Sequence, residues 1–271
     1  MLIKAKLYGG GRLLIPYLVW SMLYLMKDLL TNGEITVKRI IYAFCTGKAA
    51  TPFYYIVVMV QLTLLTPWLI KIKNRKWLYA VTPIYLVFLY GFNLYIGQMP
   101  GLYETFFPAW FSFYIFGMDC RIGKWDNIIE RAQRSWSVMA LLISIIEGFV
   151  LLEKGCAIGF ASSQIRFGSF LYASVIALIL MKHRDMSSKN RNLRNLMVSI
   201  GNCSYGIFYV HMFVLMIIQK AVAMTWMFQM WILDFVACFV LTAVGSYLIV
   251  VGTKSLAKKL GIEKALNLLG F

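Results

Sequence analysis

The residue with the clearest capacity for chemistry is His211, which ends the segment Ser204–His211, SYGIFYVH. This segment lies within an apolar run long enough to cross a bilayer. An ionisable side chain in hydrocarbon is costly, so it usually faces a partner, a cavity or a substrate. Imidazole also moves protons near neutral pH. Two interpretations follow: a base that acts on a substrate, or a bundle-facing histidine that hydrogen-bonds a neighbouring helix.

Ser204 is the nearest candidate partner for His211 on the same helix. Seven residues place the two side chains on one helical face, offset by about 20°. They are separated by about 10 Å along the axis, because each residue rises ~1.5 Å. A hydrogen bond needs about 2.6–3.2 Å, so a continuous helix excludes a direct nucleophile–base pair. We therefore expect Ser204 to cap a break in the helix or to hydrogen-bond the backbone near Gly201 and Gly206.

The composition indicates the class of protein that must position these residues. Hydrophobic residues make up 61% of the chain and charged residues only 14%, whereas soluble domains carry about 25% charged residues. The net charge of +16 comes from short basic clusters between apolar runs, which is typical of loops beside a lipid bilayer and not of a nucleic-acid-binding protein. The five cysteines are scattered, so neither a disulfide framework nor a zinc site is indicated.

The apolar runs predict an all-α, polytopic transmembrane helix bundle of about eight spans, forming a single domain over residues 1–271. Each run approaches the ~20 residues that a bilayer needs. The predicted spans are 12–30, 52–70, 77–97, 106–121, 136–153, 165–182, 197–219 and 227–252.

The distribution of Lys and Arg predicts the orientation of these spans. Twenty of the 27 basic residues lie in the N-terminal segment, the loops 71–76, 121–134 and 182–194, and the C-terminal tail. The positive-inside rule therefore places both termini and these loops in the cytoplasm. We expect the basic, amphipathic tail at 256–271 to lie along the cytoplasmic leaflet.

Polar residues within the predicted spans lean toward the outer half of the bundle. Gln61 is mid-span, Glu147 and Asp234 lie near the outer ends of their helices, and Gln164 and Arg166 lie at the outer mouth of the sixth span. This distribution fits a cavity that opens outward. For Asp234, Gln164 and Arg166, an ordinary interfacial position is the alternative.

Four stretches of the chain resemble, in order, motifs of the acyltransferase-3 family of membrane proteins. Ser204–His211 is similar to the signature Ser-Tyr-x-Ile-Tyr-Leu-x-His of the family's penultimate helix. Arg12–Trp20, RLLIPYLVW, resembles the basic, proline–tyrosine entry to its third helix. Thr51–Ile56, TPFYYI, with LLTPW at 64–68, resembles its Trp-Phe-Leu helix ending in a proline. FFP at 106–108 with FGM at 116–118 resembles its Phe-Phe-Pro…Phe-x-x-Gly span. The resemblance that these motifs carry extends over nearly the whole chain.

The resemblance implies a membrane-embedded enzyme that moves an acyl group, most often acetyl from acetyl-CoA, onto a hydroxyl of a cell-surface or lipid-linked carbohydrate. It implies a bacterial plasma-membrane location, acyl-CoA as co-substrate, and no bound cofactor or metal. His211 would be a secondary base or an acceptor-orienting group. The residues expected to contact substrate are Arg12, Tyr54, Tyr55, Ser204, Tyr205 and Tyr209. For the tyrosines, packing or a membrane-belt position is the alternative.

The chain also departs from the family pattern. Family members typically have ten helices, and the first carries an arginine and then a histidine taken to be catalytic. This sequence begins where the third helix begins, and Gly9-Gly10-Gly11 interrupts the usual basic cluster. We therefore expect a chain without the first two helices and with activity near background. Two alternatives to a transferase stay open: a polysaccharide exporter or flippase-like carrier, and an inactive fragment.

Overall fold

The described structure is helical, as the apolar runs predict. The computed structural model describes residues 2–183, 191–225 and 230–271, with backbone alone for 2–12 and 32, and these residues form α-helices and 3-10 turns without a strand. Within this part of the chain, six helical segments are long and apolar enough to cross a membrane: Leu13–Thr31, Thr51–Lys71, Lys76–Ile96, Arg134–Glu153, Arg191–Ala223 and Trp231–Lys259. The all-helical class is confirmed. The count of eight spans and the cytoplasmic termini stay predictions.

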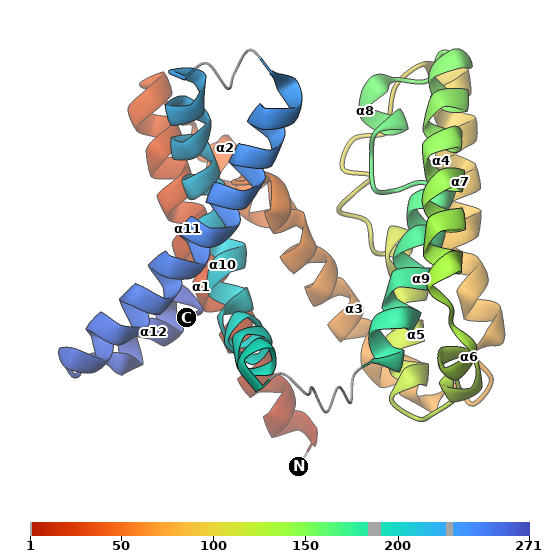
Figure 1. Cartoon of the computed structure of the whole chain (residues 1–271), viewed down its shortest axis with the longest axis horizontal. Helices are drawn as coiled ribbons and strands as arrows, with labels where there is room; N and C mark the ends of the chain where they lie inside the picture. Colours follow the sequence, from red (N-terminus) through yellow and green to blue (C-terminus); the bar gives the residue numbers. More distant parts are fainter. Residues whose placement is uncertain (1, 184–190, 226–229) are drawn as a thin grey trace. The chain divides into compact units, whose positions relative to one another are not determined.

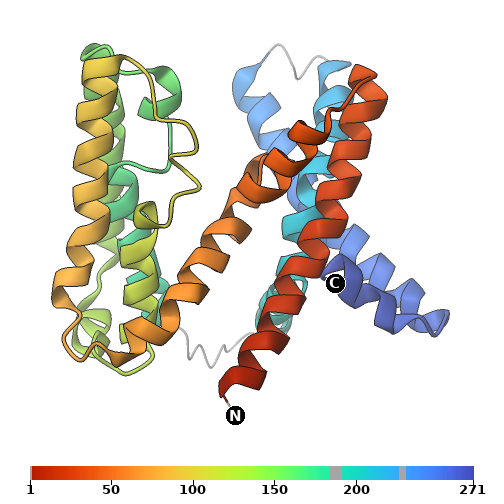
Figure 2. The ribbon, with the colours of Figure 1, turned by 180° about the vertical axis from the view of Figure 1, so that it is seen from behind.

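The chain divides into two compact units, and the first combines both ends of the sequence, residues 1–56 and 188–271. Its helices are α1 (Leu2–Asn32), α2 (Val37–Thr46), α10 (Arg191–Ala223), α11 (Trp231–Lys259) and α12 (Glu263–Leu269). The 3-10 turn η1 (Thr51–Phe53) leads into α3 (Tyr54–Lys71). The most extensive packing joins α10 to α11, and α1 lies alongside α10 (Figures 1 and 2).

The core of the first unit is aromatic. Tyr17, Trp20 and Tyr24 recur at helical spacing along α1, and all three side chains are buried. They pack around Phe53 and Tyr209, both of which are fully buried. Aromatic pairs at these separations add to the burial of apolar area. The core therefore fixes α1 and the start of α3 against the middle of α10.

The C-terminal tail packs into this core. The indole Nε1 of Trp20 donates a hydrogen bond of 3.0 Å to the carbonyl of Leu269, and the Phe271 ring lies 6.3 Å from the Trp20 ring. A Cβ added to Gly206 of α10 would lie 2.8 Å from Phe271 and 2.9 Å from Val250. The tail was expected to lie along the leaflet. Its last residues pack on α1 and α10, where Gly206 leaves room for a ring. The position of the tail along the leaflet stays a prediction.

The second unit comprises residues 57–187. After α3 it contains η2 (Lys76–Ala80), α4 (Val81–Ile96), η3 (Phe107–Ala109), α5 (Phe111–Cys120), α6 (Asp126–Arg131), α7 (Arg134–Glu153), α8 (Ile158–Ala161) and α9 (Phe167–Lys182). Its most extensive packing joins α7 to α9. The fourth and sixth predicted spans correspond to α5, with 10 residues, and α9, with 16. Both are shorter than the six segments named above.

The fourth predicted span, 106–121, is only partly helical. Pro108 lacks a backbone N–H and lies in the η3 turn before α5 begins at Phe111. The non-helical backbone before α5 is satisfied by Gln61 of α3. Its amide donates to the carbonyl of Thr105 at 3.0 Å and accepts from the Phe107 N–H at 3.0 Å. The mid-span position of Gln61 thus has a structural explanation.

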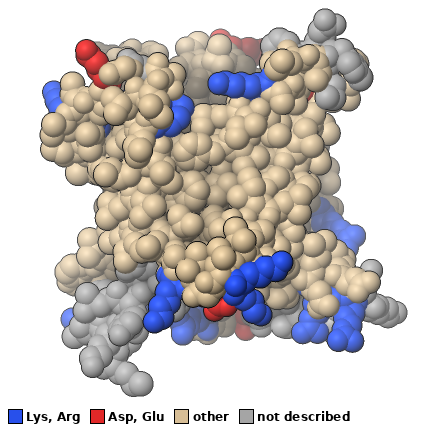
Figure 3. Space-filling view, turned by 90° about the vertical axis from the view of Figure 1, so that its left-hand side faces the viewer, with Lys and Arg blue, Asp and Glu red and all other residues tan. Residues whose placement is uncertain are grey.

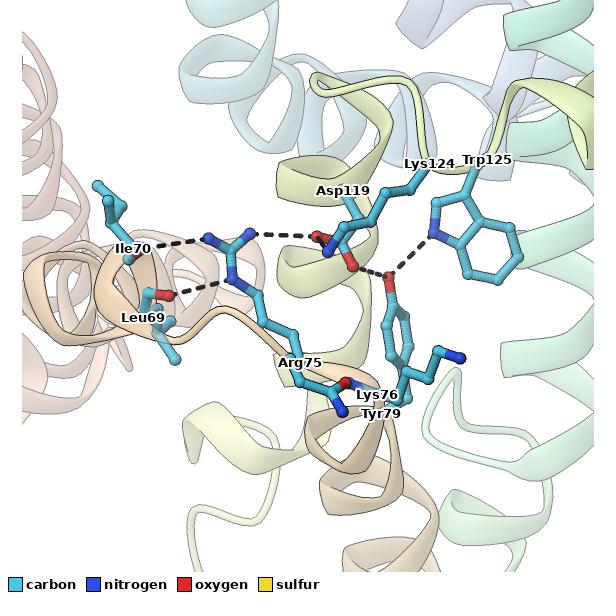
Figure 4. Close-up of polar contacts among 9 residues, drawn as sticks. Leu69, Ile70, Arg75, Lys76, Tyr79, Asp119, Lys124 and Trp125 are labelled. Carbon is cyan, nitrogen blue, oxygen red and sulfur yellow. Dashed lines mark hydrogen bonds and ion pairs between the residues drawn. The ribbon is translucent and has the colours of Figure 1, made fainter.

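The basic loops of the second unit meet at one end of it. Arg75, in the loop after α3, pairs with Asp119 at the end of α5 with a distance of 3.1 Å from Nη1 to Oδ1 (Figure 4). Lys182 at the end of α9 donates a hydrogen bond of 2.9 Å to the carbonyl of Ala132, between α6 and α7. The loops 71–76 and 121–134 therefore lie at the same end as Lys182, which agrees with the predicted alternation. Which face of the membrane this end adjoins stays a prediction.

The charge distribution on the surface agrees with a membrane-spanning protein. On the face drawn in Figure 3, most of the visible Lys and Arg lie toward the two ends, and the centre of the face is tan. The middle of such a face can contact hydrocarbon without burying a charge.

Candidate functional site

His211 lies in the middle part of α10, which runs without interruption from Arg191 to Ala223. The expected break near Ser204 is therefore absent from this helix, and the prediction that Ser204 caps one is wrong. The helix is continuous because Gly201 and Gly206 are both tolerated within a long apolar helix packed on α11. A continuous helix also confirms that Ser204 and His211 do not form a direct nucleophile–base pair.

Ser204 and His211 nevertheless line one pocket, which lies between α10 and α11 and has a volume of about 550 Å³. Its wall is mostly apolar, with a few polar side chains. The lining residues are Ile200, Ser204, Ile207, Phe208, His211 and Leu215 of α10, and Cys238, Phe239, Thr242 and Ala243 of α11. An apolar pocket with a small number of polar groups is typical of a binding site for a small molecule. We refer to it below as the His211 pocket.

The backbone of α10 sets the tautomer of His211. The Nδ1 atom lies 3.1 Å from the carbonyl oxygen of Ile207, one turn earlier. A carbonyl oxygen only accepts hydrogen bonds, so Nδ1 carries the proton in this contact. In the neutral ring Nε2 is then unprotonated and able to accept a proton. His211 is half-buried, and the centroid of its ring lies 6.2 Å from that of the Phe208 ring. A role of His211 as a base stays a prediction.

Thr242 of α11 is a polar residue of this pocket that the sequence analysis missed. Its side chain is buried, and its Oγ1 has no hydrogen-bond partner among the described residues. An unpartnered buried hydroxyl costs free energy. The Thr242 Oγ1 atom is enclosed, so it can contact a molecule in the pocket only when the side chain rotates. The signal in the sequence is Thr242 with Ser246 one turn later, in an otherwise apolar run. Cys238, also in the wall, donates to Oδ1 of Asp234 with an Sγ–O distance of 3.6 Å.

Tyr209 lies on the other side of α10 and serves the packing of the helices. Its hydroxyl donates a hydrogen bond of 3.2 Å to the carbonyl of Leu13, and its own carbonyl accepts one of 3.1 Å from the Tyr24 hydroxyl. With no exposed surface, Tyr209 matches the packing alternative among those considered for the tyrosines.

Among the other residues predicted to bind substrate, Tyr54, Tyr55 and Tyr205 do not line the His211 pocket. Tyr55 and Tyr205 are 45% and 48% exposed, and the Tyr55 ring packs at 5.9 Å against Phe208, whose side chain does line the pocket. Tyr54 is half-buried at the start of α3. Arg12 belongs to α1, and its side chain lies outside the described residues. A substrate role for these four residues stays a prediction.

The outer-half polar residues fall into two groups. Asp234 lines a pocket of about 740 Å³ in the first unit with Lys27 and Lys220. In the second unit, the carboxylate of Glu147 accepts hydrogen bonds from the Tyr90 hydroxyl and from the Gly168 N–H at the start of α9. Arg166 lies beside them and is buried. The structure therefore brings polar residues of each unit together within that unit.

These observations define a polytopic helical membrane protein with an ionisable pocket between two spans. Comparison with protein families then identifies the chain more closely: the model of an acyltransferase domain, the acyltransferase-3 family, matches residues 9–251. The chain belongs to this family, and the resemblance noted in the sequence is confirmed. No curated protein and no solved structure matches the chain.

Proposed function

We propose that this protein transfers an acyl group, acetyl from acetyl-CoA, to a hydroxyl of a cell-surface or lipid-linked carbohydrate in the bacterial plasma membrane. The observation that carries the proposal is the orientation of His211, whose Nε2 is available as a base within a pocket that also contains Ser204 and Thr242. Membership of the acyltransferase-3 family supports the acyl transfer. The acyl donor and the acceptor are parts of the proposal.

The reaction that we infer is a direct displacement at the thioester. His211 Nε2 accepts the proton of the acceptor hydroxyl while that oxygen attacks the thioester carbonyl. The C–S bond then breaks, the new C–O ester bond remains on the carbohydrate, and the proton passes from His211 to the leaving thiolate. The negative charge on the carbonyl oxygen needs a hydrogen-bond donor. Thr242 of the pocket wall is our candidate for this donor. Its Oγ1 is enclosed and without a partner among the described residues, and it reaches the pocket on rotation of the side chain.

The basic end of the second unit supports a polyanionic donor. Lys73, Lys76 and Arg121 are exposed there, beside the Arg75–Asp119 pair. Fields from such clusters raise the local concentration of anions and steer their approach. The phosphates of acetyl-CoA are therefore expected to collect at this end, which the positive-inside rule assigns to the cytoplasm.

Deletion of the gene tests the proposal. The envelope carbohydrate of the deletion strain, of the parent and of a strain complemented with the intact gene is isolated, and base-released acetate is measured per sugar. Loss of acetyl groups on deletion and their return on complementation are the expected results. Unchanged acetylation with loss of the surface polymer would instead favour the carrier. Unchanged acetylation with unchanged polymer would contradict both.

A further inference from the structure

Arg166 is a buried cation of the second unit that the proposed transfer does not use. Arg166 is the residue that directly precedes α9, and it is 8% exposed. Nε donates to the carbonyl of Ser163 at 3.0 Å, and Nη1 donates to the carbonyl of Ser144 at 3.2 Å. A guanidinium has five N–H groups. The other three have no partner among the described residues, and both acceptors are neutral.

Glu147 does not form an ion pair with Arg166. Both oxygens of Glu147 are already engaged, one by the Tyr90 hydroxyl and the other by the Gly168 N–H at 2.7 Å. The positive end of the α9 dipole further compensates the Glu147 charge. The described residues show no ion pair of Arg166 with a carboxylate. Because buried charges are normally paired, this guanidinium lacks an anion.

A pocket leads to the guanidinium. It has a volume of about 240 Å³, and Arg166 and Ser144 line it together with Gly148 and Ser162. Gly148 makes room for the cation, since a Cβ there would lie 2.8 Å from Nη1. A site shaped around a buried cation fits an anionic group.

The rest of the pocket wall is apolar and open to the surroundings of the bundle. The four large apolar side chains in the wall are between 44% and 76% exposed: Ile145, Phe149, Leu152 and Ile158. Ile145, Phe149 and Leu152 lie on α7, a segment apolar enough to cross a membrane. A ligand that satisfies both parts of the wall needs an anionic head and a hydrocarbon tail.

We propose that this pocket binds a lipid with a net negative, phosphate-containing headgroup. The phosphate accepts hydrogen bonds from the free N–H groups of Arg166, which match phosphate geometry. The acyl chain lies along Ile145, Phe149 and Leu152 of α7. This site is separate from the His211 pocket and does not depend on the proposed acyl transfer.

Lipid retention by the whole, detergent-purified and delipidated chain tests the site. Native mass spectrometry measures the bound fraction of phosphatidylglycerol and of phosphatidylcholine with identical acyl chains. The protein is expected to retain phosphatidylglycerol in preference to phosphatidylcholine, and Arg166→Gln is expected to reduce that preference about tenfold. Lys154→Gln is the control. It removes an exposed cation of the segment between α7 and α8, before Arg166 in the sequence, and is expected to leave the preference for phosphatidylglycerol unchanged. Equal retention of the two lipids, or a preference unaffected by Arg166→Gln, would overturn the assignment.

Two further measurements keep the test decisive. Ser162→Trp narrows the pocket without touching the Arg166 contacts to Ser144 and Ser163, and it should also abolish the preference. If Arg166→Gln fails to fold, loss of the preference in Ser162→Trp supports the site and its retention overturns it. The second measurement is competition by inorganic phosphate, the third ligand tested after the two lipids. Displacement of phosphatidylglycerol by equimolar phosphate would identify a free-anion site and overturn the lipid assignment.

Discussion

Tyr24 of α1 donates a hydrogen bond of 3.1 Å to the backbone carbonyl of Tyr209 in α10, which lies 185 positions later in the chain. The connection is reciprocal, because the Tyr209 hydroxyl donates to the carbonyl of Leu13 in α1 at 3.2 Å. Two buried tyrosines thus join α1 to the helix that carries His211. The position of the candidate base depends on this pair of contacts.

Tyr209→Phe is expected to destabilise the protein by about 1–2 kcal/mol, since it removes a hydrogen bond inside a packed core. The change is measured as the shift in melting temperature in detergent, with the folded fraction after heating determined by size-exclusion chromatography. Tyr95→Phe is the matched control because Tyr95 is 89% exposed. Equal melting temperatures for the two variants would show that the Tyr209–Leu13 contact contributes nothing.

Under the proposed mechanism, which requires activity above the near-background level expected from the sequence, His211→Gln should lower acyl transfer by roughly 10²–10⁴-fold, the usual contribution of a general base. The assay is acetate incorporation into envelope carbohydrate by complemented cells. His183→Gln is the control, because His183 is exposed at the end of α9 in the other unit. If both variants acetylate as well as the parent, His211 is a packing residue.

Thr242→Val separates a ligand contact from a structural role. Valine has nearly the same shape, so removing an unpartnered buried hydroxyl should raise stability by about 1 kcal/mol. If Thr242 stabilises the oxyanion, activity should fall by up to roughly 10²-fold in the same variant.

Ser246→Ala provides the control for Thr242→Val. Ser246 is also fully buried and unpartnered among the described residues, yet it does not line the His211 pocket. The Ser246→Ala variant should therefore gain stability without losing activity. Equal activity of the Thr242→Val variant and the parent would remove Thr242 from the proposed mechanism.

Asp119→Asn is expected to destabilise the protein by about 3–5 kcal/mol. The carboxylate binds Arg75 and Lys124, each at 3.1 Å, and accepts a hydrogen bond from Tyr79 (Figure 4). Loss of its charge leaves the largely buried Arg75 without a counter-ion. Lys124→Gln removes a cation that is 42% exposed, so about 0–1 kcal/mol is expected. Denaturant titration of the purified variants compares the two losses, and similar values would contradict the buried-pair explanation.

Labelling of single introduced cysteines tests the predicted orientation of the spans in the membrane. In a chain whose native cysteines are replaced, Lys73→Cys should react with a membrane-impermeant maleimide only after the cells are opened. Lys154→Cys should react in intact cells, because its loop is predicted to lie outside. Both positions are exposed in the structure. Labelling of Lys73→Cys in intact cells would reverse the predicted topology.

The sequence predicted the helical class and six of the helical segments, because hydropathy is a local signal. It also drew attention to His211, because an intramembrane histidine is rare, and the role of this residue stays a prediction. It did not predict that the fourth span is interrupted before α5, since the compensation comes from Gln61, 44 residues before Thr105. Thr242 escaped notice for a similar reason. Its lack of a partner is a property of the packed α10–α11 pair and not of the residues around it.

The discontinuous first unit has a consequence for synthesis. At about 5–20 residues per second, roughly 10–40 s separate the translation of Tyr24 from that of Tyr209. During this interval α1 has left the ribosome without the helix that completes its core. The second unit is contiguous from 57 to 187 and can assemble meanwhile. The contacts of α1 with α10 therefore cannot form until α10 emerges, and we expect α1 to depend on an insertase during this interval.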